Sequence, residues 1–385
     1  MIIPAADRTS GVSEYYFSTK NRQIAAMNAD GRSEPVLDLG IGAPNGRPPQ
    51  DAIDALCSEA QKDGVHAYQD YRGTPELRKA FAAWYERYYG VSLDVNSQLQ
   101  PLVGSKEGIL IVSLAFLNKG DKLLVPDPGY PTYTSSARLC EAEAIPYDLE
   151  ESLVWQPDFD KLEKMDLRGV KLMWTNYPGM PTGAPATKDL FERLVDFGRR
   201  HKILIVNDNP YSFIMSDKPL SIFTVPKAFT CALELNSLSK SHNMSGWRIG
   251  VATGGADYIG ELLKVKSQMD SGMFRPLQIA AAAALSQGPE WFAALNEEYR
   301  RRRAAASKIF DVLGASYNPD SQGLFLWGKV GGDSVQKSDF FLHEAGVFMT
   351  PGIIFGKNGE GHLRISLCRN VPLYERAVEK IKAVL

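Results

Sequence analysis

The sequence has few residues of the kinds that build disulfide frameworks and metal sites. Among its 385 residues are four cysteines, Cys57, Cys140, Cys231 and Cys368, which lie far apart and form no CxxC pair. This spacing excludes a disulfide framework and suits a reducing compartment. The five histidines show no metal-ligand spacing either, so we expect no bound metal; they are His66, His201, His242, His343 and His362.

An excess of charge of one sign and long apolar runs are also lacking. The net charge is −2, so no basic excess points to nucleic acid or an anionic membrane. The longest apolar run, at 109–117, is too short to cross a bilayer. The first residues, MIIPAADRTSGVSEYY, lack the basic region and apolar stretch of a signal peptide. We therefore expect a soluble, cytoplasmic protein that binds neither nucleic acid nor membrane.

What the sequence does have is an alternation of short β-rich runs and longer helical patterns between residues 49 and 287. Helical patterns occupy 105–120, with an expected end at Gly120, and 187–201. Apolar strands separated by helices predict an α/β fold, with a mostly parallel sheet covered on both faces. We assign 49–287 to a large domain, with candidate strands at 101–104, 121–127, 143–149, 169–176, 202–208, 230–237 and 248–255.

The pattern changes after residue 288. A long charged helix is predicted at 289–314, and its run of four arginines, 300–303, stands beside two glutamates, which favours a solvated helix face over a nucleic-acid patch. Further β-rich runs at 324–330, 347–352 and 362–368, with a helix at 338–346, predict an α+β part. Residues 1–48 do not follow the alternation, and we group 1–48 with 288–385 as a small domain.

Polar residues that follow strands are the candidates for a site, because ligands of such sheets bind outside the carboxyl ends of the strands. Asp208 ends one strand; it either caps a turn, the commoner case, or faces a cation such as a protonated ring nitrogen. The segment GSKEG, 104–108, opens a helix and either binds an anion through its backbone N–H groups or is an ordinary start capped by Ser105. Tyr130 either stacks on a flat ring or packs in its Pro/Gly turn.

Two cations stand at the ends of apolar runs, Lys240 and Arg248. Together with Ser237 and Ser239, the arginine would suit a phosphate group. Lys240 is then either a second phosphate contact or an amine that forms a Schiff base with an aldehyde on the same ligand. A carboxylate for a ring nitrogen, a tyrosine, a lysine and a phosphate site together describe pyridoxal phosphate.

In combination these segments resemble the class I/II aminotransferases of fold type I, the aspartate-aminotransferase-like enzymes that use pyridoxal 5′-phosphate. The resemblance covers nearly the whole chain and rests on five motifs in the family's order: GIGAP at 40–44, YQDYRGTPELR at 68–78, DNPY at 208–211, SLSKSHNMSGWRIG at 237–250 and LRISL at 363–367. It implies transfer of an amino group between an L-amino acid and a 2-oxo acid by a homodimer.

The resemblance also implies a role for each residue. Lys240 is expected to bond covalently to the cofactor and later to move the substrate proton, Asp208 to pair with the ring nitrogen, and Tyr211 to bond the ring hydroxyl. Arg364 and the Gly42 backbone would grip the substrate α-carboxylate. The remaining cofactor contacts are expected from Gly104, Ser105, Lys106, Tyr130, Ser237, Ser239 and Arg248, with Tyr68 reaching in from a second subunit.

The chain departs from the family pattern at Met180, which stands in NYPGMPTG where the family has an asparagine. A thioether donates no hydrogen bond, so cofactor tuning is expected to differ. Arg275 either meets a distal substrate carboxylate or is structural, and we favour the second. Two other functions stay open: a carbon–sulfur β-lyase on the same cofactor, and a ligand-sensing module without catalysis. The latter is disfavoured because the aminotransferase-like segment begins the chain directly.

Overall fold

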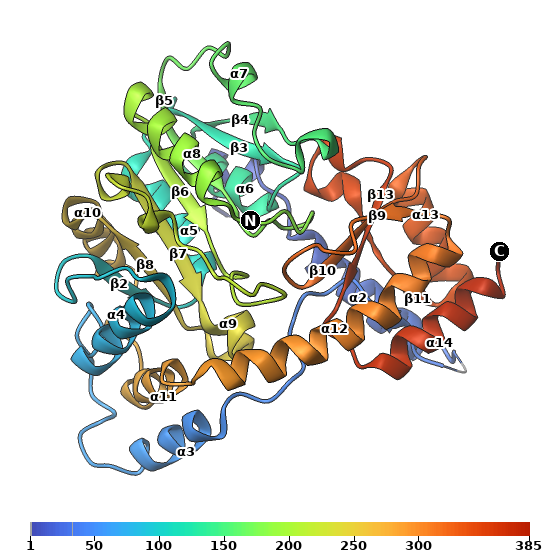
Figure 1. Cartoon of the computed structure of the whole chain (residues 1–385), viewed down its shortest axis with the longest axis horizontal. Helices are drawn as coiled ribbons and strands as arrows, with labels where there is room; N and C mark the ends of the chain where they lie inside the picture. The colour runs from blue at the N-terminus through green and yellow to red at the C-terminus, as the bar shows by residue number, and fades with distance from the viewer. Residues whose placement is uncertain (1, 33) are drawn as a thin grey trace.

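The computed structural model describes residues 2–32 and 34–385, and its largest sheet has seven strands in the order β2-β8-β7-β6-β5-β3-β4 (Figure 1). Within this sheet β8 is antiparallel to both of its neighbours, and all other pairs are parallel. The predicted mostly parallel sheet is thus confirmed. The strands are β2 Leu99–Leu102, β3 Lys122–Asp127, β4 Glu143–Asp148, β5 Val170–Thr175, β6 Leu204–Asp208, β7 Ala232–Ser237 and β8 Gly250–Gly254.

Helices cover both faces of this sheet, as the continuous apolar strands require. One face packs against α5 (Ser105–Phe116), α6 (Pro131–Leu139) and α10 (Ala256–Lys266). The other packs against α4 (Pro75–Tyr89), α8 (Lys188–His201) and α11 (Arg275–Leu285), and α11 in turn packs against α3 (Gln50–Glu59). The apolar residues Leu190, Leu194 and Phe197 recur at helical spacing along α8 and form its buried stripe.

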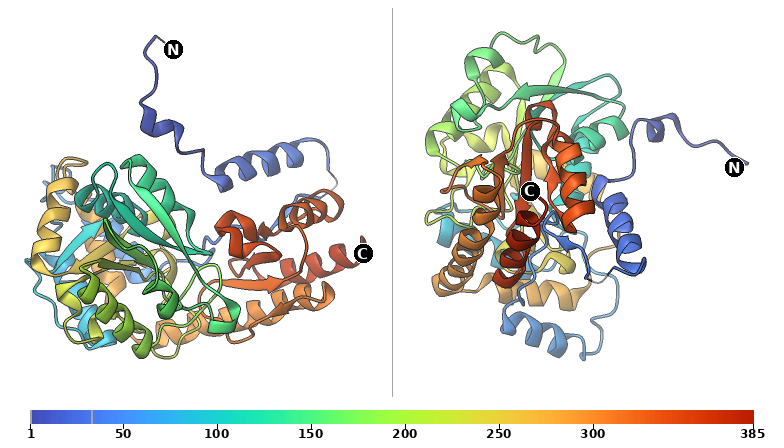
Figure 2. Two further views of the ribbon diagram at one scale, coloured as in Figure 1. Left: turned by 90° about the horizontal axis from the view of Figure 1, so that it is seen from above. Right: turned by 90° about the vertical axis from the view of Figure 1, so that its right-hand side faces the viewer.

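The long helix α12 (Pro289–Val312) leads to a second, antiparallel sheet of order β12-β13-β10-β9 (Figure 1). Its elements are β9 Ser316–Tyr317, β10 Phe325–Lys329, β12 Thr350–Pro351 and β13 His362–Ser366, with α13 Ser334–Phe340 and α14 Val371–Lys382. The N-terminal part joins this region because β1 (Leu37–Asp38) pairs in parallel with β11 (Val347–Phe348). Figure 2 shows residues 2–6 extending away from the body, whereas α1 (Asp7–Ser10), which precedes α2 (Tyr16–Ala29), lies beside α6.

Two expectations about helices are corrected. Helix α5 ends at Phe116 rather than at Gly120, because Asp121 accepts hydrogen bonds from the backbone and side chain of Asn118 and so forms a competing turn. The arginine run is only half solvated: Arg302 is buried and donates to the Leu367 carbonyl, 3.2 Å away. Among the described helices, none has the length and apolar character needed to span a bilayer.

Candidate active site

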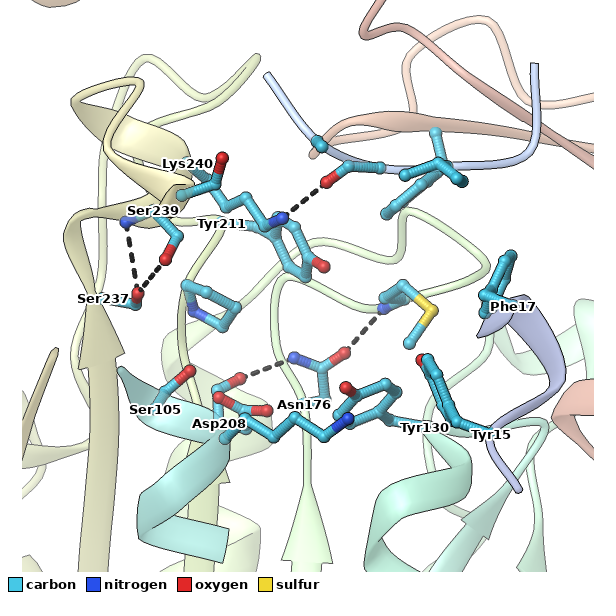
Figure 3. A pocket seen from close by; sticks show the side chains of 18 of the residues that line it. Tyr15, Phe17, Ser105, Tyr130, Asn176, Asp208, Tyr211, Ser237, Ser239 and Lys240 are labelled. Carbon is cyan, nitrogen blue, oxygen red and sulfur yellow. Dashed lines mark hydrogen bonds between the residues drawn. The ribbon is translucent and has the colours of Figure 1, made fainter. Parts of the chain in front are cut away.

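A pocket of about 760 Å³ opens where the carboxyl ends of β5, β6 and β7 meet the second sheet and α2 (Figure 3). In Figure 3, Ser105, Ser237 and Ser239 gather on one side, and Tyr15 and Phe17 stand on the other. The structure therefore brings together residues that are far apart in the chain, from Tyr15 to Arg364. The predicted site residues that line the pocket are Gly42, Ser105, Lys106, Tyr130, Asp208, Tyr211, Ser237, Ser239, Lys240, Arg248 and Arg364.

Asp208, the last residue of β6, is buried with half of its carboxyl group unsatisfied. Its Oδ2 accepts a hydrogen bond of 2.9 Å from the Tyr133 hydroxyl, whereas Oδ1 is buried without a partner in the described part of the chain. Burial raises the pKa of Asp208 to about 7. A protonated ring nitrogen beside Oδ1 would satisfy this oxygen and hold the carboxyl group in its charged form.

Lys240 reaches the pocket from α9 (Leu238–Ser241), the short helix that follows β7. Its Nζ donates to the carbonyl oxygen of Gly42, a bond marked in Figure 3. Burial is the main cause that lowers the pKa of the Lys240 amine, with Arg248 and Arg364 adding to the effect. A lysine whose pKa is lowered has more of the neutral, nucleophilic amine available at neutral pH.

Hydroxyl groups, a guanidinium and a helix N-terminus converge on one side of the pocket. Helix α5 starts at Ser105 with Gly104 as its N-cap and without a side-chain cap, so its first backbone N–H groups are free for a ligand. The alternative in which Ser105 caps the helix is therefore wrong. The Ser237 hydroxyl donates to the Ser239 hydroxyl, 2.9 Å away. We call the group of Gly104, Ser105, Ser237, Ser239 and Arg248 the anion cup.

Close packing in the anion cup requires glycine at position 104. Gly104 has a φ of +77°, and a Cβ atom there would lie 2.1 Å from Nη2 of Arg248. The Arg248 guanidinium is held in place by the Ser245 carbonyl at 2.9 Å and the Ser239 hydroxyl at 3.3 Å. The arrangement presents a fixed cation and several donors to an anion such as phosphate.

Arg364 of β13 lies on the opposite side, buried and without a carboxylate partner among the described residues. Its Nη2 donates to the Gly40 carbonyl at 2.7 Å, its Nη1 faces the Met180 sulfur at 3.2 Å, and its Nε has no partner in the described part of the chain. The ring of Phe325 stacks on it at 3.9 Å. Burial lowers the pKa of Arg364 to about 10, which leaves it charged at neutral pH. Such a guanidinium suits a carboxylate ligand.

Several pocket residues were missed by the sequence analysis. Tyr133 follows Tyr130 by one helical turn, a spacing that could have suggested it. Asn176 holds the loop behind the pocket, since its amide donates to the Asp208 carbonyl at 2.6 Å and its oxygen accepts from the Met180 N–H at 2.7 Å. Tyr15 and Phe17 reach the site from the N-terminal segment, which lies outside the alternating pattern of strands and helices.

Two predicted site residues lie outside the pocket lining. Gly104 contributes through its contact with Arg248, whereas Tyr68 is 90% exposed and does not reach the pocket of its own chain. Arg275 pairs with Glu59 at 2.8 Å and Glu76 at 3.0 Å, which supports the structural interpretation. The described residues contain no group of three or more histidine, cysteine or acidic side chains that could hold a metal.

Comparison with known proteins agrees with this geometry. The fold superposes on aspartate aminotransferase of Thermus thermophilus with a TM-score of 0.91 at 24% identity over the whole of both chains, and so is aspartate-aminotransferase-like, fold type I. A substrate-bound BacF structure from Bacillus subtilis superposes with a TM-score of 0.93, 32% identity, and coverage of 99% of this chain and 98% of that one.

The family itself follows from the sequence comparisons. The model for "Aminotransferase class I and II" matches residues 34–381. LL-diaminopimelate aminotransferases of Oleidesulfovibrio alaskensis and Aquifex aeolicus are 37% and 36% identical, each over 98% of both chains. The chain belongs to the class I and II aminotransferases. It is an aminotransferase of the pyridoxal-phosphate-dependent kind, which moves an amino group between an amino acid and a 2-oxo acid.

Proposed function

We propose that this chain binds pyridoxal phosphate covalently through Lys240, with the phosphate in the anion cup and the ring nitrogen at Asp208. The unpartnered, buried Oδ1 of Asp208 carries the proposal, because a buried polar atom of this kind needs a ligand to satisfy it. Tyr130 would stack on the ring and Tyr211 would bond the ring hydroxyl, and both line the same pocket.

Each residue then has a physical task in the reaction. When bound, the cofactor supplies an electron sink that makes the substrate Cα–H bond acidic. The Asp208 carboxylate would keep the ring nitrogen protonated, and the amine of Lys240 would take the Cα proton and return it during transfer. Arg364 fixes the α-carboxylate, so that the Cα–H bond is oriented toward the lysine.

The attachment is tested by trapping. Borohydride reduction of the purified holoenzyme followed by peptide mapping should place the cofactor on Lys240. Label on another lysine in the pocket, Lys106, would contradict the assignment.

We propose LL-diaminopimelate as amino donor, since the LL-diaminopimelate aminotransferases are 35–37% identical to this chain over nearly its full length. Besides Lys240, Arg248 and Arg364, the pocket is lined by the cations Lys106 and Arg22. Lys106 lies 4.2 Å from the Tyr15 ring centroid and makes no ion pair within the described residues, whereas Arg22 is held by Glu14. A second carboxylate on the substrate would suit such cations.

A screen of amino donors against 2-oxoglutarate and pyruvate tests this substrate. LL-Diaminopimelate is expected to give the highest kcat/KM, and preference for a monocarboxylic donor would refute the proposal. Release of pyruvate and ammonia from a cysteine conjugate without an acceptor would instead reveal β-lyase activity.

The role of Arg364 has its own test, the variant Arg364→Ala. The lost contact is a charge-assisted pair in a dry site, so amino-acid binding should weaken by about 2–5 kcal/mol. Cofactor affinity should stay near that of the wild type, because Arg364 lies away from the anion cup. Equal KM values for the two proteins, or loss of the cofactor, would contradict this role.

The assembly, location and domain boundaries are further proposals. We propose a homodimer in which Tyr68 serves the neighbouring site, supported by its 90% exposure on its own chain. A cytoplasmic location is supported by four free cysteines. We also propose two domains, a large one at 49–287 and a small one formed by 1–48 and 288–385. The change of sheet between β8 and β9 supports these boundaries.

A further inference from the structure

Lys266, at the end of α10, is a fully buried cation outside the pocket. Its side chain is 1% exposed, and its Nζ donates to Glu107 Oε1 at 3.1 Å and to the Asp270 carboxylate. A buried ion pair usually stabilises a fold little more than apolar side chains would. The position of Lys266 near the start of α5 therefore says more about its role than its contribution to stability does.

Glu107 links this lysine to the anion cup. It lies in the first turn of α5, where its Oε2 accepts a 2.6 Å hydrogen bond from the Val103 backbone N–H. This bond fixes the residue that precedes Gly104 and so shapes the cup. It also places a carboxylate at the same helix N-terminus that would receive a phosphate dianion, where the two negative charges would repel each other and compete for the helix dipole.

Asp270 adds a second carboxylate to the cluster. One of its oxygens accepts from Nζ of Lys266, and the other accepts from the Gly272 N–H at 3.0 Å. Without Lys266, two carboxylates would face each other behind the cup.

We propose that Lys266 is a positioning residue that neutralises Glu107 and thereby leaves the N-terminus of α5 free to bind the cofactor phosphate. The proposal rests on the proposed binding of pyridoxal phosphate at Lys240. Lys266 acts through Glu107 and not by contact with the ligand, since it does not line the pocket.

The test compares two aldehydes that differ only in the phosphate. Dissociation constants of pyridoxal phosphate and pyridoxal are measured by absorbance on cofactor-free wild type and Lys266→Met. The variant should lose about tenfold of the wild-type preference for the phosphorylated aldehyde, while its affinity for pyridoxal changes little. Lys264→Met is the matched control, because Lys264 is on the same helix, 72% exposed and paired with Glu261; its preference should stay unchanged.

A second substitution separates charge from structure. Adding Glu107→Gln to Lys266→Met should restore the preference for the phosphorylated aldehyde. Glu107→Gln alone should keep or increase this preference, and this single variant tests the proposal if Lys266→Met does not fold. Wild-type preference in Lys266→Met, an equal loss for both aldehydes, or a lost preference in Glu107→Gln would overturn the inference. A wild type with no preference for the phosphate would instead refute the proposed cofactor site.

Discussion

Asp208 and Arg364 are both buried in the pocket, and each lacks a partner of opposite charge in direct contact within the described chain. Burial of an unpaired group costs free energy unless a ligand repays it. In the proposed site the two side chains would lie at opposite ends of the bound ligand, with a cationic ring at Asp208 and a carboxylate at Arg364. Substitutions at single pocket residues can test how they affect the pH dependence of stability and the titration of the bound cofactor.

Asp208 should make the stability of the cofactor-free protein depend on pH. Its pKa is about 7 in the folded chain and about 3.9 when unfolded, so the folded state binds the proton more tightly. Its contribution to stability is complete below pH 4 and is lost as the pH rises to 7, at about 1.4 kcal/mol per pH unit. Unfolding in urea at pH 5 to 8 should show this slope up to about pH 7, and a plateau above it, in the difference between wild type and Asp208→Asn.

The control for that measurement is the bound cofactor. Saturation with pyridoxal phosphate should abolish the slope, because a cation beside Asp208 keeps the carboxylate ionised. Parallel pH profiles of wild type and variant without cofactor would show that Asp208 does not titrate in this range.

Met180→Asn should change the titration of the bound cofactor. In the family pattern an asparagine at this position donates to the ring hydroxyl oxygen and favours its anionic form. One amide N–H of Asn176 donates to the Asp208 carbonyl, so an unchanged titration would mean that its second N–H already bonds the ring hydroxyl. The pH at which the cofactor absorbance changes should fall by about one unit, because such a bond is worth about 1.5–3 kcal/mol before solvent competition. Met180→Leu, which adds no donor, should leave the titration unchanged; a rise with asparagine would contradict the role.

At the scale of the element, the decisive feature is how α5 begins. A helix that starts without a side-chain cap leaves donors unsatisfied, and here they point to the pocket with Arg248 beside them. The sequence placed this helix start correctly, but its end was predicted four residues too late. The turn at Asn118 depends on a side-chain hydrogen bond that periodicity does not reveal.

Gly104→Ala should weaken cofactor binding, because the new Cβ would lie 2.1 Å from Arg248 Nη2 and displace the guanidinium. We expect an affinity loss of about tenfold or more, from one charge-assisted contact to phosphate. Gly120→Ala is the control: its φ of +83° is also one that L side chains rarely adopt, but no atom lies within 4 Å of the added Cβ. Equal cofactor affinity in both variants would contradict the role of the close contact.

At the scale of the whole molecule, the site is assembled from distant segments. The pocket combines α2, the strand ends of the large sheet and β13 of the second sheet, and pairing of β1 with β11 holds the N-terminal segment beside the last third of the chain. Tyr68 stands outside this assembly, fully exposed, which is the expected state of a residue that completes a neighbouring subunit's site.

Shared sites predict complementation between two defective subunits. Tyr68→Ala and Lys240→Ala should each be nearly inactive as homodimers, because one lacks the phosphate contact and the other the covalent lysine. After subunit exchange, the mixture should regain part of the activity, since a hybrid dimer contains one site with both residues intact. Exchange verified by mass spectrometry without any recovery would show that Tyr68 does not cross to the partner.

Local apolar periodicity and short-range motifs predicted a mostly parallel sheet, its covering helices and the candidate residues from Gly42 to Arg364, because such patterns are carried by neighbouring residues. They did not predict that Tyr133, Asn176, Tyr15 and Phe17 line the same pocket, that Met180 faces Arg364, or that Lys266 pairs with Glu107; these contacts appear only in the folded chain. These contacts join residues up to about 350 positions apart. They depend on strand order and on the packing of one sheet against the other, which no local pattern specifies.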